Sequence, residues 1–409
     1  MTAIILTMII ERPDEIRKIN SLDNWTLVYG RRKTGKTFLV KDYMDWDDYF
    51  FVKRDRTILD QENTSMTYDT FIAILRRNID GKKVTVVDEF HRLPDEFFDL
   101  LHSIGEGGRI ILVSSILHLS KQFFSTGSPL TGLFAEIPMP IIDLKDTLKA
   151  TEDSKISLKE RLELAILLRE PIAARFVKGV NKRNLLGDVI YFSRQTIPAL
   201  VGEIFSEEER KLSGIYDGIL RAVADGKGIS GGISSYLYSR RSINKDDPSL
   251  IQNHLNNLMK VGILKRIKVY NKNRFVYKHT SPLVHLFYYA DEKYNITERE
   301  PTPTELRNII NKNFPYLVED AIREHLAMRE AMAEAVIQFP ECDIDVCLLK
   351  FKKPKIIGEI KWKDRIRKAD ISRAEDVLSR FDADKKFLFV PDKRGISSDV
   401  LEIMDVTDL

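Results

Sequence analysis

The sequence predicts a protein of the α/β class, with a parallel-sheet domain that carries a helical extension and two smaller units behind it. Three observations lead to this prediction. The 409 residues are enough for about three domains at ~150 residues each. Short apolar runs alternate with amphipathic stretches at the start of the chain, as parallel strands alternate with covering helices. Hydrophobic residues make up 43% of the chain and charged residues 31%, which argues against a mostly disordered chain.

Strands and helices alternate through residues 1–145. A continuous apolar run such as 84–87 is typical of a strand buried on both faces, and apolar residues at helical spacing indicate helices. The predicted strands are 25–29, 49–52, 84–87, 109–114 and 137–142. The predicted helices are 36–45, 68–78 and 93–104. We expect a parallel sheet covered on both sides.

The pattern of predicted elements changes twice in the rest of the chain. Helices are predicted first at 158–169, 172–177 and 185–192. Three further helices and two strands, in the order of a winged helix, are predicted at 207–224, 230–239, 249–261, 263–269 and 274–279. A polar stretch with two prolines at 295–305 indicates a linker. The predicted domains are 1–200, 201–295 and 305–409.

Composition limits the cellular compartment in which we expect the protein and the kinds of partner that it can bind. The net charge of +3 gives no global field for nucleic acid, so a basic surface must be local. The two cysteines, Cys342 and Cys347, exclude a disulfide framework and a four-cysteine zinc site. No apolar run approaches the ~20 residues of a membrane span, and the apolar first ten residues lack a basic start and a cleavage site. We therefore expect a cytoplasmic protein without a membrane partner.

Residues 30–37 match the phosphate-binding pattern G-x-x-x-x-G-K-T in full, between a predicted strand and a predicted helix. The glycines allow a turn whose N–H groups point inward, and the helix N-terminus adds a positive dipole end. We expect Lys36 to reach the β- and γ-phosphates of ATP and Thr37 to bind Mg²⁺. The predicted nucleotide-binding residues of the loop are Gly30, Arg31, Arg32, Lys33, Thr34, Gly35, Lys36 and Thr37.

A second motif follows the predicted strand at 84–87. Asp88 comes where ligands bind at the carboxyl edge of a parallel sheet, so we expect it to hold Mg²⁺. Glu89 is placed to polarise the attacking water, which favours hydrolysis over transfer. Ser114 and Ser115 end the next strand, and Ser115 is either a sensor of the γ-phosphate or an ordinary turn former.

These motifs, together with Ile-Glu-Arg-Pro-Asp-Glu at 10–15 and Ser-Pro-Leu-Thr-Gly at 128–132, resemble the archaeal-type P-loop ATPases, relatives of the AAA+ and STAND regulatory ATPases. The resemblance covers roughly residues 1–290 and implies a P-loop NTPase domain followed by a winged helix. It also suggests the strand order of the additional-strand group. The family often has an arginine finger where this chain has Leu133. The remaining candidates, each alternatively a surface or structural arginine, are Arg31, Arg32, Arg92 and Arg169.

Two strand-like runs near the C-terminus, 343–349 and 356–362, carry Asp345, Glu359 and Lys361. Alternate side chains share a face of a strand, so Glu359 and Lys361 point the same way. If the runs pair across a polar connection at 350–355, Asp345 falls beside Glu359. Close carboxylates repel unless a cation lies between them, so this pair could share a water-activating Mg²⁺. Asp343 shares the face of Asp345 and is an alternative to it.

A helix expected to open at 316 would bring Glu319 to complete the set. The order of Glu319, Asp345, Glu359 and Lys361 resembles the PD-(D/E)xK nuclease fold over roughly residues 305–395, with Ile344-Asp345 in place of Pro-Asp. The resemblance implies a small α/β restriction-endonuclease-like domain that cleaves DNA with Mg²⁺. An ordinary hairpin with charged edge residues is the alternative.

DNA is the expected partner. Nine basic residues lie between 350 and 368 against Glu359 and Asp364, which suits a phosphate backbone. The segment 249–261 presents amides that can read base edges. A basic wing is expected from Lys265, Arg266, Lys268, Lys272 and Arg274. Alternatively, the winged helix packs on another domain, a protein partner or a second copy of the chain.

The sequence thus predicts a nucleotide-switched ATPase that acts on DNA. ATP and Mg²⁺ would bind at the phosphate loop and change the placement of the winged helix and of the C-terminal domain, which cuts DNA. One alternative is a regulatory switch whose nuclease-like fold binds without cutting. Another is a motor that translocates along DNA.

Overall fold

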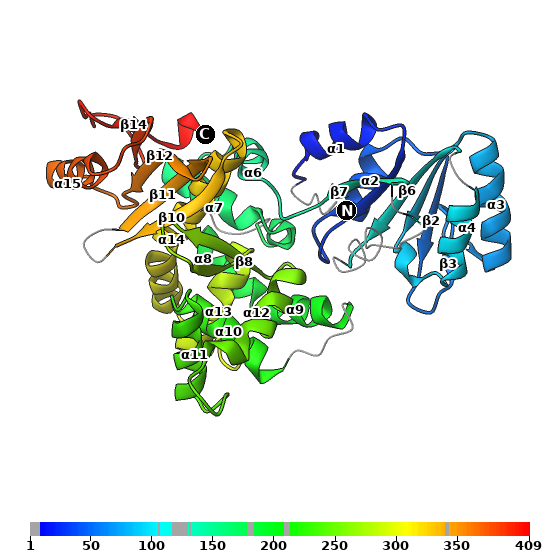
Figure 1. Ribbon diagram of the computed structural model, residues 1–409, viewed down its shortest axis with the longest axis horizontal. Helices are drawn as coiled ribbons and strands as arrows, with labels where there is room; N and C mark the ends of the chain where they lie inside the picture. The colour runs from blue at the N-terminus through cyan, green and yellow to red at the C-terminus, as the bar shows by residue number, and fades with distance from the viewer. Residues whose placement is uncertain are drawn as a thin grey trace, which may run out of the picture.

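The computed structural model describes residues 9–104, 107–116, 130, 132–177, 184–207, 213–339 and 343–409. Two seven-stranded sheets organise these residues. The N-terminal sheet and its helices lie on the right of Figure 1, and the second sheet lies on the left with most of the remaining helices. The helices α6 (Leu144–Ala150) and α7 (Leu158–Leu168) lie between the two sheets (Figure 1).

The N-terminal sheet has the order β4-β3-β2-β5-β6-β1-β7. Its strands are β1 (Trp25–Tyr29), β2 (Asp48–Val52), β3 (Ile58–Leu59), β4 (Ser65–Met66), β5 (Val84–Asp88), β6 (Arg109–Ser114) and β7 (Phe134–Pro138). The five strands from β2 to β7 in this order pair in parallel, whereas β3 and β4 add an antiparallel edge. Because β6 lies between β1 and β5, the sheet has the additional-strand order that the sequence suggested.

Helices cover both faces of this sheet. On one face, α3 (Tyr68–Asp80) and α4 (Glu96–Ile104) pack Phe71 and Phe97 onto strand residues such as Leu27 and Phe50. On the other, α1 (Pro13–Asn20) and α2 (Lys36–Tyr43) pack onto Val28 and Val86. Burial on both faces explains why these strands read as continuous apolar runs.

Two predicted elements of this domain differ from the structure. The strand predicted at 137–142 is β7, which begins earlier because Phe134 pairs with Trp25 at the start of β1. The helix predicted at 93–104 begins at Glu96, after the 3₁₀ turn Phe90–Arg92 and Pro94. Proline disfavours helical backbone in the residue before it, which accounts for the later start.

The middle of the chain is helical and shares one apolar core with the second sheet. Its elements are α6, α7, the 3₁₀ turn Pro171–Arg175, α8 (Leu185–Ser193), α9 (Thr196–Glu207), α10 (Gly214–Ala224), α11 (Ser230–Ser239), the 3₁₀ turn Pro248–Ile251, α12 (Gln252–Lys260) and α13 (Pro282–Tyr294). The helix predicted at 207–224 is wrong at its start, because α9 ends at Glu207 and α10 begins at Gly214. The segment predicted as a helix at 172–177 is a 3₁₀ turn that opens at Pro171.

The second sheet has the order β14-β13-β12-β11-β10-β8-β9. Its strands are β8 (Leu264–Val269), β9 (Phe275–His279), β10 (Ala333–Gln338), β11 (Asp343–Lys350), β12 (Lys353–Ile360), β13 (Lys385–Phe389) and β14 (Glu402–Met404). The helix α15 (Lys368–Ser379) packs on it through Ala374 and Leu378.

The predicted boundary between the second and third domains runs through this sheet. The ribbon β8–β9 follows α10, α11 and α12 in the predicted order, but β8 also pairs in parallel with β10, where Lys268 lies opposite Ala335. An unpaired strand edge offers free N–H and C=O groups, and here β10 satisfies them. The ribbon is thus built into the C-terminal sheet, and the winged-helix assignment stays a prediction.

One long helix replaces the short helix predicted to open at 316. The helix α14 (Pro303–Arg329) begins within the predicted linker, with a capping box between Thr302 and Glu305 and a proline in its first turn. Pro315 lies inside it. Among the described residues, no helix is long and apolar enough to cross a bilayer.

Candidate functional site

The phosphate loop joins β1 to α2 as the motif predicts. Gly35 has a φ of 92° directly before α2, a conformation that favours glycine. A Cβ on Gly30 would lie 2.2 Å from the carbonyl oxygen of Met139, so only glycine fits where β1 ends. The two glycines therefore have backbone reasons for their positions.

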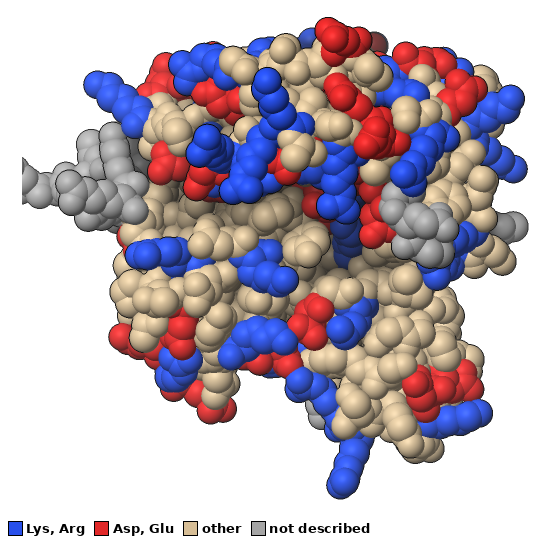
Figure 2. Space-filling view, turned by 90° about the vertical axis from the view of Figure 1, so that its left-hand side faces the viewer, with Lys and Arg blue, Asp and Glu red and all other residues tan. Residues whose placement is uncertain are grey.

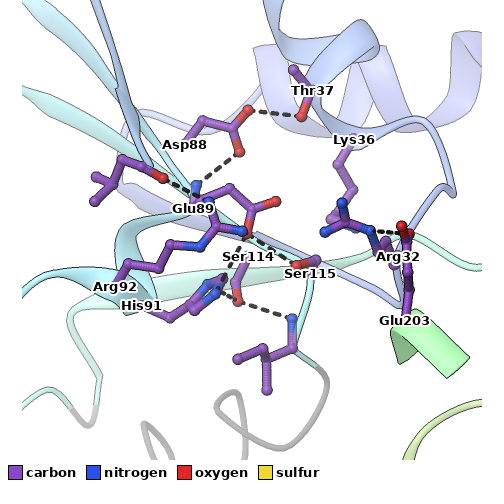
Figure 3. Close-up of polar contacts among 12 residues, drawn as sticks. Arg32, Lys36, Thr37, Asp88, Glu89, His91, Arg92, Ser114, Ser115 and Glu203 are labelled. Atoms are coloured by element: carbon purple, nitrogen blue, oxygen red, sulfur yellow. Dashed lines mark hydrogen bonds and ion pairs between the residues drawn. The ribbon is translucent and has the colours of Figure 1, made fainter. Parts of the chain in front are cut away.

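Lys36 and Thr37 open the helix after the loop. The Lys36 Nζ donates to the carbonyl oxygens of Gly30 at 2.8 Å and of Arg31 at 2.9 Å. The Thr37 hydroxyl donates to Asp88 Oδ2 at 2.7 Å, which joins the loop to the end of β5 (Figure 3). The two motifs thus meet at the carboxyl edge of the sheet.

Three donors surround the Asp88 carboxylate. Besides Thr37, the Tyr49 hydroxyl donates to Oδ2 at 2.8 Å and the Glu89 N–H donates to Oδ1 at 2.9 Å. Burial raises the pKa of Asp88, and the hydrogen bonds from Thr37 and Tyr49 act against that rise. An oxygen ligand beside a threonine hydroxyl is the donor set that Mg²⁺ prefers.

Glu89 is held at the next position by polar neighbours. Its Oε2 accepts from the Ser115 hydroxyl at 3.0 Å and lies 3.1 Å from Arg92 Nη2 and 3.4 Å from His91 Nε2 (Figure 3). Its backbone has a φ of 56°, which is uncommon for a residue with a side chain. Strained backbone of this kind clusters at functional sites.

A cavity of about 910 Å³ opens beside the loop. From the phosphate-binding motifs it is lined by Arg32, Lys33, Thr34, Gly35, Lys36, Thr37, Glu89 and Ser115. Apolar side chains such as Ile10, Ile142 and Ile172 form another part of its wall. A polar end beside an apolar wall suits a ligand with a charged and an aromatic part.

Arg31 does not face this cavity, contrary to the prediction that it binds nucleotide. Its guanidinium forms a buried ion pair with Glu170, just after α7. The Thr34 hydroxyl donates to the Arg31 carbonyl oxygen at 3.0 Å. The two basic side chains at the start of the loop therefore have separate roles, since Arg32 pairs with Glu203 at 2.6 Å and lines the cavity.

The candidate finger arginines also have partners within this chain. Arg92 donates to the Val52 carbonyl oxygen at 2.7 Å as well as contacting Glu89. Arg169 donates to the Ile142 carbonyl oxygen at 3.1 Å and forms an ion pair with Glu324. Leu133 packs against the core between α3, α4 and the sheet.

The C-terminal carboxylates come together across the hairpin. Val346 lies opposite Gly358, a register that places Asp345 beside Glu359 as predicted. The Asp345 Oδ2 accepts from the Ile360 N–H at 2.8 Å, and Lys361 Nζ donates to Glu359 Oε2 at 2.6 Å. The turn between the strands is shorter than predicted, because Lys350 pairs with Lys353 and leaves two residues between them.

Glu319 joins this set from α14. Burial, followed by the charge of Asp345, raises the pKa of Glu319 to about 8 and that of Glu359 to about 7. Burial also raises the pKa of Asp345. Burial and the mutual repulsion of the carboxylates outweigh the positive charges nearby, among them Lys361, which act to lower these pKa values.

The set is incomplete as a metal site. Within the described parts of the chain, no three His, Cys, Asp or Glu residues are arranged to hold a metal ion. The Glu359 Oε1 is nonetheless buried without a hydrogen-bond partner, which is costly for a carboxylate oxygen. Asp345 and Glu359 therefore fit a divalent cation chemically, while their present arrangement does not yet form its ligand shell.

The predicted base-reading face of 249–261 is partly engaged inside the protein. Asn257 donates to the Tyr216 hydroxyl at 2.8 Å, and the ring of His254 packs edge-on against the same tyrosine. In the ribbon, Lys265 forms an ion pair with Glu324, and Lys272 donates to the Gln338 carbonyl oxygen. These contacts favour packing on the C-terminal domain over the open wing that we predicted.

Charges of both signs cover the side of the molecule that carries the second sheet. Figure 2 shows Lys and Arg scattered across that face among uncharged residues, with Asp and Glu between them and a hollow near its middle. A mixed surface of this kind gives no single field, so any contact with DNA must be local.

Several residues of these sites were missed by sequence reasoning. Tyr49 was predicted only as part of a strand, Glu170 lies between two predicted helices, and Glu324 follows the point where a helix was expected to open. No spacing links them to the motifs: Glu170 is 139 positions from Arg31, and Glu324 is 155 positions from Arg169. Tyr49 alone could have been suspected from the sequence, because its hydroxyl lies in a predicted strand that precedes the strand ending at Asp88.

Comparisons with known proteins agree with the fold of the N-terminal domain. Residues 22–148 match the family described as an AAA domain. A Walker-type ATPase of Pyrococcus abyssi is similar in structure, with a TM-score of 0.51 and 18% identity over 68% of this chain and 96% of that one. No curated protein matches the sequence.

Two other archaeal structures are less similar to this one in overall fold. The ORC1 protein of Aeropyrum pernix, solved in complex with DNA, has a TM-score of 0.33 and 13% identity, over 72% of this chain and 96% of that one. A STAND protein with a tetratricopeptide repeat sensor from Pyrococcus horikoshii has a TM-score of 0.32 and 15% identity, over 78% of this chain and 50% of that one.

The strand order and the phosphate loop agree with the match of residues 22–148 to the AAA-domain family. The helices that follow residue 150 and the second sheet lie outside the family match.

Proposed function

We propose that this protein is a Mg²⁺-dependent ATPase whose nucleotide state controls a C-terminal nuclease-like domain that acts on DNA. The observation that carries the proposal is the hydrogen bond from Thr37 to Asp88 beside the cavity. It brings a phosphate-binding loop and an acidic strand end into one place. Lys36 and Glu89 line the same cavity.

Each residue of the site has a separate role in ATP hydrolysis. Lys36 exchanges its two carbonyl partners for phosphate oxygens, and Thr37 and Asp88 would hold the Mg²⁺. When bound, that ion neutralises charge on the phosphates. Glu89 accepts a proton from the attacking water, and Ser115 keeps the carboxylate oriented through its hydrogen bond.

The ATPase proposal is tested by two variants of the full-length protein. Lys36→Ala removes phosphate binding, so nucleotide affinity and turnover should both be lost. Glu89→Gln should keep ATP binding and lower turnover by about 10²–10⁴-fold, because only the proton acceptor is removed. Tyr68→Phe, at a partly buried tyrosine of α3 outside the cavity lining, serves as the control. Hydrolysis retained by Lys36→Ala would show that another site is responsible.

For the C-terminal domain we propose Mg²⁺-dependent DNA cleavage. Asp345 and Glu359 would hold the ion, which would supply an activated water and stabilise charge on the phosphodiester. Lys361 would orient that water, and Glu319 would complete the carboxylate set. The buried, unpartnered Glu359 Oε1 supports this assignment.

A plasmid-nicking assay with Mg²⁺ tests cleavage. Wild-type protein should nick DNA, whereas Asp345→Ala and Lys361→Ala should not. Lys385→Ala, at a lysine of β13 that pairs with Glu402 outside the basic run, is the control and should retain activity. Equal cleavage by every variant would reveal a contaminating nuclease and remove the basis for the claim.

Contacts of α7 support the proposed control by nucleotide. Beyond its C-terminal end, Glu170 pairs with Arg31 of the phosphate loop. Nearer its start, Glu163 accepts from Trp362 Nε1 at 2.8 Å, directly after Lys361. The helix and the residues directly after it therefore link the phosphate loop to the residue beside Lys361, and a rearranged phosphate loop can act on the C-terminal carboxylates through them.

The main alternative is a regulatory switch that binds DNA or protein without cutting. It is favoured by the absence of a formed ligand cluster among the described residues and by the bond between Lys361 and Glu359. Nicking assays with ATP, with a non-hydrolysable analogue and without nucleotide separate the two. No cleavage in any state, together with nucleotide-dependent DNA or partner binding, would favour the switch.

A further inference from the structure

The turn between β11 and β12 exposes an aromatic side chain. Phe351 is 90% exposed, whereas Val400, the next most exposed large apolar residue in the described part of the chain, is 60% exposed. Single apolar side chains on a surface are common and need no special explanation. The backbone of this turn and its charged neighbours distinguish Phe351 from such cases.

The backbone of the turn is strained. Phe351 has a φ of 50° and Lys352 a φ of 65°, between the paired residues Lys350 and Lys353. A two-residue turn with both φ values positive favours Asn-Gly, because a side chain crowds the backbone in this region. A phenylalanine and a lysine are therefore poor choices for the turn itself. Their presence indicates that the side chains serve another purpose.

Three lysines lie next to Phe351 in the chain. Lys350, Lys352 and Lys353 are exposed, and none forms an ion pair with a carboxylate of the residues that the structure describes. The next lysine, Lys355, differs because it pairs with Asp384 at 3.0 Å. An aromatic ring among unpaired ammonium groups is suited to nucleic acid, since bases stack on the ring and phosphates bind the ammonium groups.

The turn belongs to the hairpin that carries the C-terminal carboxylates. Six strand positions separate Lys353, at the end of the turn, from Glu359, which corresponds to about 20 Å along β12. At about 3.4 Å per base pair, that distance spans roughly six base pairs of duplex. One DNA molecule can therefore contact the turn and reach the carboxylates together.

We propose that residues 350–353, the aromatic tip, bind DNA at a place where bases are unstacked, such as a gap or a branch. Phe351 stacks on an exposed base, and the three lysines bind the flanking phosphates. The inference rests on the proposed action on DNA and deepens it by naming the kind of DNA that is bound. Apolar wedges that enter DNA at such steps act in the same physical way.

Binding of the full chain to labelled DNA tests the proposal, in EDTA so that no cleavage occurs. The probes are a short duplex and the same duplex with a short gap. Wild-type protein should prefer the gapped DNA. Phe351→Asn should lose about 5- to 100-fold in affinity for the gap and little for the duplex. Phe351→Trp should retain the preference, because it keeps a stacking surface.

Two further variants separate the ring from the charges and from the backbone. Changing Lys350, Lys352 and Lys353 to serine should weaken binding to both DNAs and lower the slope of log affinity against log salt by about 3. Lys352→Gly relieves strain but keeps the ring, so it should still prefer the gap. Phe351→Asn also relieves strain, so its thermal midpoint should equal or exceed that of the wild type. A loss of affinity then does not reflect misfolding.

The outcomes distinguish this inference from the proposed function. If Phe351→Asn binds gapped DNA as the wild type does, the aromatic tip is refuted while action on DNA stands. If the wild type binds neither DNA, both proposals are overturned. If sedimentation with anionic vesicles depends on Phe351 and the preference for gapped DNA does not, the tip contacts lipid and the inference is wrong.

Discussion

At the residue scale, the Asp88 carboxylate shows how packing changes the pKa of one group. Burial raises its pKa, and hydroxyl donors from two different elements offset that rise. The Thr37 hydroxyl is part of the phosphate-loop motif, but the Tyr49 hydroxyl comes from β2. Since both donate to Oδ2, the anion that would hold Mg²⁺ depends on a residue outside either motif.

Tyr49→Phe tests this dependence. The ring still fills its buried space, but the loss of one hydrogen bond raises the pKa of Asp88 further and disfavours its anion. The Mg²⁺ concentration for half-maximal ATP turnover should rise by about 10-fold, the equivalent of one hydrogen bond to a charged group. Tyr68→Phe, which removes the hydroxyl of a partly buried tyrosine outside the cavity, is the matched control. An unchanged Mg²⁺ requirement would show that the Tyr49 hydroxyl does not support the site.

Glu319 gives a second residue-scale prediction, which concerns pH. Its folded pKa of about 8 lies above the ordinary value of 4.5, because of burial and Asp345. Between these pH values the folded state holds a proton that the unfolded state releases, so stability falls as pH rises through this window. Glu319→Gln should match the wild type near pH 4 and exceed its thermal midpoint by about 2–4 °C at pH 9.

Added Mg²⁺ provides the control for that experiment. If Glu319 and its neighbours bind the ion, Mg²⁺ should stabilise the wild type at pH 9 and reduce its difference from Glu319→Gln. Glu152→Gln, at an exposed carboxylate before α7, should follow the wild type throughout. Parallel pH profiles of the wild type and Glu319→Gln would contradict the raised pKa.

At the element scale, α14 connects parts of the molecule that the sequence divided. It begins within the stretch predicted as a linker, and its Glu324 pairs with both Arg169 and Lys265. One helix thus contacts the end of α7 and the ribbon as well as the second sheet. Proline signals misled the prediction here, because Pro303 occupies the first turn, where no N–H is needed.

Glu324→Gln should therefore destabilise the protein by about 3 kcal/mol, since it leaves Arg169 buried without its ion pair. Burial alone would raise the pKa of Glu324, but Arg169 and Lys265 outweigh it and lower the pKa to about 2. The stabilisation is thus present above pH 4.5 and is lost as pH falls through 2. Denaturant unfolding at several pH values checks this. A difference that does not shrink in acid would contradict the assignment.

At the scale of the whole molecule, α7 lies between the two sheets and contacts both proposed sites (Figure 1). The ion pair of Glu170 and the bond from Glu163 to Trp362 are buried, so small movements at one end are not absorbed by solvent. A second contact, from Lys159 to Asp364, lies beside the first.

Nucleotide binding should therefore alter hydrogen exchange around Trp362. In the wild type, a non-hydrolysable ATP analogue should change exchange at 357–364 by at least about 2-fold, because α7 transmits the rearrangement of the phosphate loop. Glu163→Ala should bind nucleotide normally and abolish that change. Glu152→Ala, an exposed change outside the contact, should keep it. A response that persists in Glu163→Ala would rule out α7 as the connection.

The local parts of the site could be read from the sequence. Residues 30–37 form a turn whose shape follows from two glycines, and Asp88 and Glu89 follow an apolar strand directly. The pairing of Asp345 with Glu359 was also predictable, because they lie on neighbouring strands of one hairpin. Strands β1 and β6 lie where the apolar runs placed them.

The sequence by itself determined the phosphate loop, the acidic strand end and the order of elements, because each depends on residues adjacent in the chain. Only the tertiary structure decided that Arg31 turns to Glu170, that the ribbon joins the C-terminal sheet and that α7 lies between the two sites. Those contacts join residues tens to hundreds of positions apart. Their partners are selected by packing and charge in three dimensions, and this information is absent from local spacing.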